Sequence, residues 1–516
     1  MTKELKIKIG QMLMCGFHTP YADEQAKRLS EEFYLGNYIL FARNFESFRQ
    51  AGRMNEMLSR MVYEKTGIAP FISTDQEGGN SSRIIEGAAL IPGAMAIAAA
   101  RGDAESIGKS TARLLKAIGV NQNLAPVADV NSNPFNPIIG IRSYGDTVQK
   151  VEKYLLPQLH GIQAGGIMGT LKHFPGHGNV KSDSHLSVPH NDASKEELYS
   201  VDFETFRAAV KAGADAVMSC HVVFDALDSE NPATLSKRIM TGLLRQEMGF
   251  EGVIMTDCLE MGAIGSTVGA GEGAVRAVEA GCDMLCVSHT YEAASSAFNA
   301  LYKAVESGRI SEERINASYE RIIRMKQKYG VTQPFEFDEA KAEALINDQT
   351  AIKQNDLTSR NGVTLIRDGG ALPFEFTRPV FMAPYCLALT GFDNPDKTPA
   401  NFAKDAAKYF GGEEIVLPLK ALTEEVKQKI LSSEGDVYVV GLYNARFNPA
   451  QAEALELIHE KGKPVIAVIL GAPYDICATN PTDTVICAYE YTALSVKNAL
   501  EALKENKFYG QLPVDI

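Results

Sequence analysis

The sequence predicts an α/β protein: a (β/α)8 TIM-type barrel followed by a smaller three-layer α/β sandwich domain. Three observations lead to this fold class. The chain has 516 residues, enough for a large barrel and a companion domain. Through the first 290 residues, short apolar runs that suit buried parallel strands alternate with amphipathic segments that suit helices. After a polar segment, a second and shorter series of the same kind begins.

The barrel strands are expected at apolar runs that end in a polar residue. Seven runs are clear, and IGQMLMCGF at 9–17 is expected to be an additional element ahead of them. The seven are 36–43, 70–75, 123–130, 166–174, 215–221, 252–257 and 283–289. Helices are predicted at 23–36, 195–213 and 271–281, several of which close on a glycine that suits a helix C-terminus. A barrel of about 330 residues fits this series better than the alternative, a doubly wound open sheet.

We expect the barrel at residues 1–335, a linker at 336–356 and the sandwich domain at 357–516. Residues 331–356 carry no strand signal and are mostly polar and helical, which is typical of a boundary. Strands are then expected at 363–368, 379–384, 436–443, 464–471 and 483–491, with helices at 421–433 and 495–506. No Gly-x-Gly-x-x-Gly or P-loop motif occurs, which weighs against a nucleotide cofactor.

Composition and charge exclude several classes of protein. Fifty-one basic and 64 acidic residues give a net charge of −13 without long runs of like charge, which argues against nucleic acid or anionic membrane as a partner. The amino terminus lacks the apolar stretch of a signal peptide, and no segment has the roughly 18 apolar residues of a membrane span. Most of the eight cysteines lie in apolar runs, so Cys282 and Cys286 are expected in the core and the protein in the cytoplasm.

The candidate functional residues are the polar side chains at the ends of the predicted strands. In a βα barrel, functional groups lie where the strands run out into the loops that follow them. Each residue alone would more often be a helix cap or a hydrogen-bonded structural residue. Together they are expected to converge on one rim, and they are Arg43, Asp75, Asp129, Lys172, His173, His221, Asp257 and His289.

The segment LKHFPGHGNVKSDSH, residues 171–185, carries the strongest chemical signal. Asp183 precedes His185 by two residues in a polar loop, so it can accept a bond from the ring and raise the affinity of the imidazole for its proton. That pairing suits a general acid and base near neutral pH. A metal site of His173, His177, Asp183 and His185 is the weaker alternative, because the helical HExxH spacing is missing and no cysteine contributes.

Asp257 is a candidate nucleophile because it ends the buried apolar run GVIMTD. A carboxylate opposite an acid/base residue is what a retaining glycoside hydrolase needs, since it can attack the anomeric carbon and later be displaced by water. The competing interpretation is that Asp257 caps the next helix.

Five motifs in a fixed order link these residues to a known family. They are DQEGG (75–79), LAPVADVNSNPFNP (124–137), RSYG (142–145), LKHFPGHGNVKSDSH (171–185) and MTDCLEMGAI (255–264). With LFARN at 40–44, they resemble the family 3 glycoside hydrolases, specifically the two-domain form of the β-N-acetylhexosaminidase branch. The similarity runs over residues 9–330 and continues more weakly through the second domain, whose start VTLIRDGGALPF and end YGQLPV resemble the family's sandwich domain.

The resemblance implies a role for each matching residue. Asp257 falls on the nucleophile, and His185, hydrogen-bonded to Asp183, falls on the acid/base. In the β-glucosidase branch the acid/base is instead a glutamate from later in the chain, so the Asp-Ser-His sequence separates the two branches. The family's residues that bind the sugar hydroxyls in the −1 subsite correspond to Asp75, Arg142, Lys172 and His173. Arg83 lies where the family often has another arginine.

The implied function is that of a retaining exo-β-N-acetylglucosaminidase that needs no metal or other cofactor. Its substrates would be saccharides carrying terminal β-linked N-acetylglucosamine, either peptidoglycan fragments, as in peptidoglycan recycling, or imported chito-oligosaccharides. The closer alternative is a phosphorylase on the same site, because a neutral histidine repels phosphate less than a carboxylate does. A β-glucosidase and a non-catalytic sugar-binding protein are more distant alternatives, and the sequence predicts no particular oligomeric state.

Two residues depart from the family's pattern. Asn80 stands where the commoner DQEGGR has arginine, so any contact made by that arginine is in doubt. Tyr144 replaces the phenylalanine of RSFG and adds a phenolic hydroxyl. Neither residue is one of the reacting groups.

Overall fold

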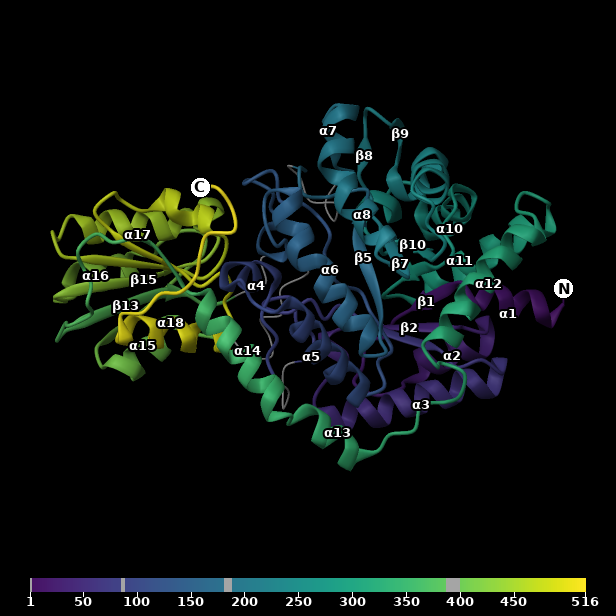
Figure 1. Ribbon diagram of the computed structural model, residues 1–516, viewed down its shortest axis with the longest axis horizontal. Coiled ribbons are helices and arrows are strands. Elements are labelled where there is room, and N and C mark those ends of the chain that lie inside the picture. The colour runs from purple at the N-terminus through teal and green to yellow at the C-terminus, as the bar shows by residue number, and fades with distance from the viewer. Residues whose placement is uncertain (1, 85–88, 181–187, 387–399) are drawn as a thin grey trace.

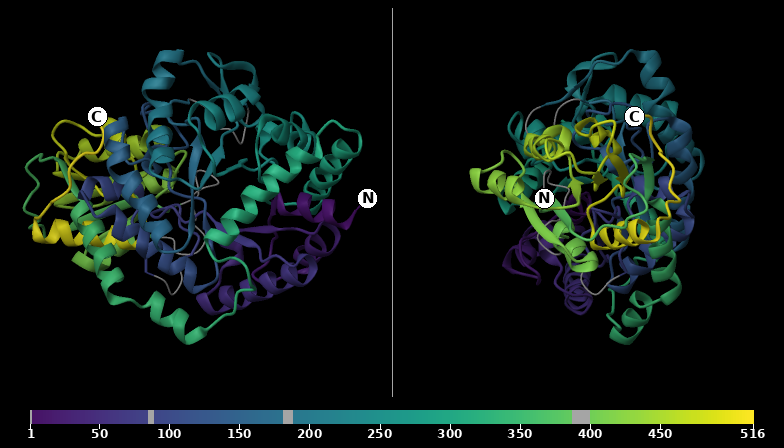
Figure 2. Two further views of the ribbon diagram at one scale, coloured as in Figure 1. Left: turned by 45° about the vertical axis from the view of Figure 1, so that its right-hand side comes forward. Right: turned by 90° about the vertical axis from the view of Figure 1, so that its left-hand side faces the viewer.

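The computed structural model describes residues 2–84, 89–180, 188–386 and 400–516. Its helices and strands form a barrel and a second, smaller part built on a separate sheet (Figure 1). Two further views show the same arrangement, with the amino terminus on the side of the barrel away from the second part (Figure 2). The fold class predicted from the sequence is therefore confirmed.

The barrel sheet has eight strands within the described residues, and all neighbouring pairs are parallel. In barrel order they are β1 (Leu13–Cys15), β2 (Asn37–Leu40), β3 (Phe71–Thr74), β4 (Gln122–Asn123), β5 (Met168–Phe174), β7 (Ala216–Ser219), β10 (Val253–Met255) and β11 (Leu285–Val287). A parallel bridge between Met255 and Met284 joins β10 to the start of β11 and closes the ring. Every apolar run predicted for the barrel, including 9–17, contains one of these strands or runs directly on from it.

Helices surround these strands and begin at residues suited to the position. Asp23, Ser47 and Thr147 each accept a hydrogen bond from the first turn of their helix, as N-cap residues do. The surrounding helices include α1 (Lys3–Gln11), α2 (Glu24–Phe33), α3 (Phe48–Thr66), α5 (Ala104–Ala117), α6 (Val148–Ala164), α8 (Asp202–Lys211), α10 (Gly269–Ala280), α11 (Tyr291–Glu306) and α12 (Glu312–Lys328). The single helix expected at 195–213 is two helices, α7 (Lys195–Ser200) and α8, because the backbone at Val201 leaves the helical region.

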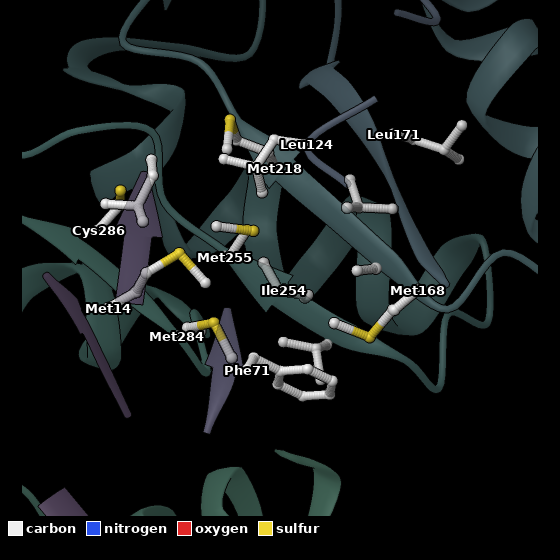
Figure 3. Close-up of a cluster of buried hydrophobic side chains, with 14 of the residues drawn as sticks. Met14, Phe71, Leu124, Met168, Leu171, Met218, Ile254, Met255, Met284 and Cys286 are labelled. Carbon is white, nitrogen blue, oxygen red and sulfur yellow. The ribbon is translucent and has the colours of Figure 1, made fainter. Parts of the chain in front are cut away.

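The inside of the barrel is a packed apolar core rather than a pore. Figure 3 shows side chains from several strands meeting there, among them Met14, Phe71, Met168, Met218 and Met255. The unbranched thioethers of methionine fill irregular gaps between rigid strands. Cys282 and Cys286 also lie in this core, as predicted.

The second part is a six-stranded sheet, counted over the described residues, with helices on both faces (Figure 1). Its order is β12 (Thr364–Arg367), β17 (Thr484–Cys487), β16 (Val465–Ile469), β15 (Val437–Leu442), β13 (Pro379–Pro384) and β14 (Glu413–Leu417). β12 is antiparallel to β17, and the other pairs are parallel. The helices are α15 (Phe402–Phe410), α16 (Glu424–Ser432), α17 (Pro449–His459) and α18 (Ala493–Glu505).

Two helices and the carboxyl terminus connect the parts. Residues 336–356 contain α13 (Glu339–Ile346) and the first half of α14 (Gln349–Gly362), which run along the outside of the barrel to the second sheet (Figure 1). The short helix α4 (Ala94–Ala100) of the barrel contributes Met95, Ala96 and Ala99 to an apolar cluster of the second part. Among the described helices, none is both long and apolar enough to cross a bilayer.

Candidate active site

The loop after β3 and strand β5 bring a lysine and two carboxylates together. Lys172 lies in β5 and is 1% exposed. Its Nζ donates to Asp75 Oδ1 at 2.6 Å and lies 2.7 Å from Glu77 Oε1. A buried ammonium needs such partners, because desolvating an unpaired charge is costly.

Glu77 also forms a salt bridge with Arg142, which follows the loop after β4. The guanidinium donates two bonds to the carboxylate, from Nε at 2.9 Å and from Nη2 at 2.8 Å, and both side chains are buried. Burial alone would raise the pKa of Glu77, but Arg142 and Lys172 outweigh it and hold that pKa well below its usual range. Glu77 thus links Arg142 and Lys172, two of the predicted subsite residues.

His173 is oriented by a second buried carboxylate, Asp129. The ring Nδ1 lies 2.7 Å from Asp129 Oδ2, and the same carboxylate accepts the backbone N–H groups of His173 and His177. Burial would raise the pKa of Asp129, but His173 and His177 together lower it. Since the carboxylate accepts from Nδ1, the neutral ring presents Nε2 as its acceptor, 3.4 Å from Arg142 Nη2.

Asp257 follows β10 and is partly exposed. Its Oδ1 accepts the backbone N–H of Cys258 at 2.7 Å. Burial would raise its pKa, but His221, His173, the Cys258 N–H and Lys172 outweigh that and lower it. Asp257 is therefore an ionised carboxylate at neutral pH. The next helix, α9 (Gly262–Gly265), has Met261 at its N-cap, so the interpretation of Asp257 as the cap of that helix is wrong.

Some of the remaining predicted residues lie in the described part of the chain, and two do not. Arg83 is buried, and its backbone N–H donates to Gln76 Oε1 at 2.9 Å. Arg43 and His289 contact each other, with Nη2 and Nδ1 3.3 Å apart. Asp183 and His185 fall in 181–187, outside the described residues.

The histidines of the metal alternative are only partly described. The rings of His173 and His177 lie 5.9 Å apart, and Asp129 occupies Nδ1 of His173. Burial, followed by the nearby His173, lowers the pKa of His177 to about 4. In the portion of the chain that the structure describes, no three His, Cys, Asp or Glu side chains gather as ligands for one metal ion.

The sequence interpretation missed Glu77 as a functional residue, although its motif DQEGG was quoted. The signal was a carboxylate two residues after Asp75 in a strand-end loop, where cations from neighbouring strand ends could reach it. Tyr144, one of the two departures from the family pattern, is buried and donates its hydroxyl to Gln158.

A βα barrel that gathers several carboxylates, histidines and a lysine at its strand ends has groups of the kind that glycoside hydrolysis uses. The model of the glycosyl hydrolase family 3 N-terminal domain matches residues 4–325. The chain belongs to glycosyl hydrolase family 3.

Individual relatives extend this match over the whole chain. The structure of a family 3 β-N-acetylglucosaminidase from Paenibacillus sp. superposes with a TM-score of 0.92 at 37% identity, covering 100% of this chain and 99% of that one. Beta-hexosaminidase A of Pseudoalteromonas piscicida is 28% identical over 90% of this chain and 85% of its own length. The beta-hexosaminidase of Thioalkalivibrio sulfidiphilus is 32% identical over 63% of this chain and 92% of its own length.

Proposed function

We propose that the protein is a retaining exo-β-N-acetylglucosaminidase that removes terminal β-linked N-acetylglucosamine from saccharides. The observation that carries the proposal is Asp257, an ionised carboxylate next to the connected group of Asp75, Lys172 and His173. The 37% identity to a β-N-acetylglucosaminidase over the full chain supports the choice of sugar.

The proposed reaction has two steps. Asp257 attacks the anomeric carbon while protonated His185, paired with Asp183, gives its proton to the glycosidic oxygen, so the aglycone leaves as an alcohol. Neutral His185 then takes a proton from water, the water oxygen attacks the anomeric carbon, and the bond to Asp257 breaks. The sugar hydroxyls would be bound by Asp75, Arg83, Arg142, Lys172 and His173.

The natural substrates are proposed to be peptidoglycan fragments in the cytoplasm, with imported chito-oligosaccharides second. The feature that favours this site of action is the set of eight cysteine thiols, seven of which are buried.

The test compares three aryl glycosides: β-N-acetylglucosaminide, β-N-acetylgalactosaminide and β-glucoside. We expect the highest kcat/KM on the N-acetylglucosaminide and free N-acetylglucosamine as the product, with or without phosphate in the buffer. A preference for the β-glucoside would contradict the choice of sugar. Sugar 1-phosphate formed only in phosphate buffer would show a phosphorylase.

The acid/base role of His185 has its own test. Protonation of the leaving oxygen matters most when the leaving group is basic, so His185→Ala should slow a disaccharide far more than an aryl glycoside with an acidic phenol. Equal losses on both substrates would mean that His185 contributes binding or positioning alone.

A further inference from the structure

One short loop belongs both to the sugar subsite and to the contact between the two parts of the chain. We call residues 75–81 the β3 loop. Its first half carries Asp75 and Glu77, which hold Lys172. Its second half carries Asn80, which faces the second part. Two adjacent residues, Gly78 and Gly79, separate the halves.

Asn80 is held by the second part at both ends of its amide. Its Nδ2 donates to the hydroxyl of Tyr443 at 2.9 Å, and its Oδ1 accepts the backbone N–H of Tyr491 at 2.8 Å. Tyr443 follows β15 and Tyr491 follows β17, and both side chains are almost fully buried. Their rings pack edge to face, 5.4 Å apart, so the site that receives Asn80 is rigid.

Glu490, next to Tyr491, lies against the same loop at Gly79. Its Oε2 accepts the backbone N–H of Gly93 at 2.8 Å. A Cβ on Gly79 would lie 2.4 Å from that oxygen, and Gly79 has a φ of +55°, so only glycine allows this approach without strain. The second part therefore packs directly against the backbone between Glu77 and Asn80.

The β3 loop is internally tight, so its two halves cannot move independently. The backbone N–H of Glu77 donates to Ser81 O at 3.1 Å, and that of Ser81 donates to Gly78 O at 3.1 Å. Gly79 N–H donates to Ile91 O at 2.8 Å. A shift of Asn80 would consequently move Glu77, which aligns Arg142 and Lys172.

We infer that Asn80 is a positioning residue through which the second part of the chain sets the affinity of the −1 subsite. This inference rests on the proposed function and adds a role for the second part. It also gives a physical reason for asparagine where the family motif commonly has arginine: an amide offers the donor for Tyr443 and the acceptor for the Tyr491 N–H that this contact needs.

The first test is Asn80→Ala in the full chain, assayed on an aryl β-N-acetylglucosaminide. Small misplacements of binding groups cost large factors, and we expect KM to rise about tenfold with kcat within about threefold of wild type. Asn80→Asp keeps an acceptor for the Tyr491 N–H and can accept from the Tyr443 hydroxyl, so it should restore most of the affinity. A purely structural role would instead lower the fraction of folded enzyme, which reduces apparent kcat and leaves KM unchanged.

A matched pair of tyrosines provides the control. Tyr443→Phe and Tyr474→Phe each remove one hydroxyl that accepts from a barrel asparagine, Asn80 in the first case and Asn131, at 3.3 Å, in the second. We expect a raised KM for Tyr443→Phe and a wild-type KM for Tyr474→Phe. Equal effects of the two substitutions, or a wild-type KM for Asn80→Ala, would overturn the inference.

Hydrogen–deuterium exchange separates this inference from the proposed function. The amides of Glu77, Gly79 and Ser81 should exchange faster in Asn80→Ala than in the wild type, whatever the substrate. Unchanged exchange would overturn the positioning role even in an active enzyme. If the wild-type chain has no activity on N-acetylglucosaminides, the proposed function is overturned. The comparison of amide exchange in wild type and Asn80→Ala would still decide whether Asn80 positions the loop.

Discussion

Asp129 is the residue on which the orientation of His173 depends. It accepts three N–H groups from two histidines and is buried, so its charge is satisfied within the protein. Because each bond comes from the segment that carries Lys172 and His173, the carboxylate fixes the backbone and the ring together. Under the proposed function, Asp129 is thus a positioning residue for His173 in the sugar site.

We expect Asp129→Asn to lower kcat/KM on an aryl β-N-acetylglucosaminide by about 10- to 100-fold, because the amide offers one acceptor oxygen in place of two and no charge. Circular dichroism should show a folded protein. A wild-type kcat/KM in a folded variant would show that the ring of His173 needs no anionic partner.

Asp202 predicts a pH dependence of stability. It lies at the start of α8, and in the described structure its Oδ1 has no hydrogen-bond partner. Burial, followed by the charge of Asp129, raises its pKa to about 8. The unfolded chain releases this proton near pH 4, so between about pH 4 and pH 8 the folded state binds more protons and stability falls as pH rises.

Asp202→Asn should remove this contribution. Urea unfolding at pH 5 and pH 8 should show the variant gaining stability relative to wild type by more than about 1 kcal/mol at the higher pH. The same change with pH in both proteins would show that Asp202 keeps an ordinary pKa in the folded state.

At the scale of elements, Asp283 ties strand β11 to its neighbours. It is fully buried and accepts from Arg245 at 2.8 Å and from Ser318 at 2.8 Å. Arg314 and Arg321 lie within 3.4 Å and 3.2 Å of the same carboxylate. Arg314 and Arg321 lie in α12, and Arg245 lies in the helix Arg238–Glu247 before β10. The side chain of Asp283 therefore connects three elements of the barrel.

We expect Asp283→Ala to lower the free energy of unfolding by about 3 to 5 kcal/mol, because three partly buried arginines lose their shared, fully buried partner. Glu272→Ala is the matched control, since Glu272 pairs with Arg309 at the surface and should change stability by less than about 1 kcal/mol. Urea unfolding followed by circular dichroism measures both. Similar small losses in the two variants would contradict the role given to Asp283.

The sequence predicts the buried strands of both sheets well and misses one exposed edge strand of the second sheet. The barrel strands appear as apolar runs because both faces are covered. The edge strand β14 was missed, since its first two residues are the exposed Glu413 and Glu414, which interrupt the apolar pattern. The contacts of Glu77 and Asn80 could not be predicted, because they join segments that are distant in sequence, and those of Asn80 also depend on how the two parts pack.

At the scale of the whole molecule, the two parts are connected at the β3 loop as well as through α13 and α14. The carboxyl terminus adds a contact, where the backbone N–H of Asp515 donates to Asp146 Oδ2 at 2.7 Å. Asp75 follows barrel strand β3, and Tyr443 follows strand β15 of the second sheet. Ends of strands from both sheets thus meet at the β3 loop. Under the proposed function, the barrel supplies the reacting groups and the second sheet supports the barrel rim.

In the proposed reaction, Asp257 forms the covalent glycosyl-enzyme. The most direct measurement is to trap the full chain with a fluorinated N-acetylglucosamine analogue, digest it and locate the added mass by peptide mapping. We expect one added sugar on the peptide that contains Asp257 and none on the Asp257→Asn variant. A sugar attached to another carboxylate, such as Glu77 or Glu490, would contradict this role of Asp257.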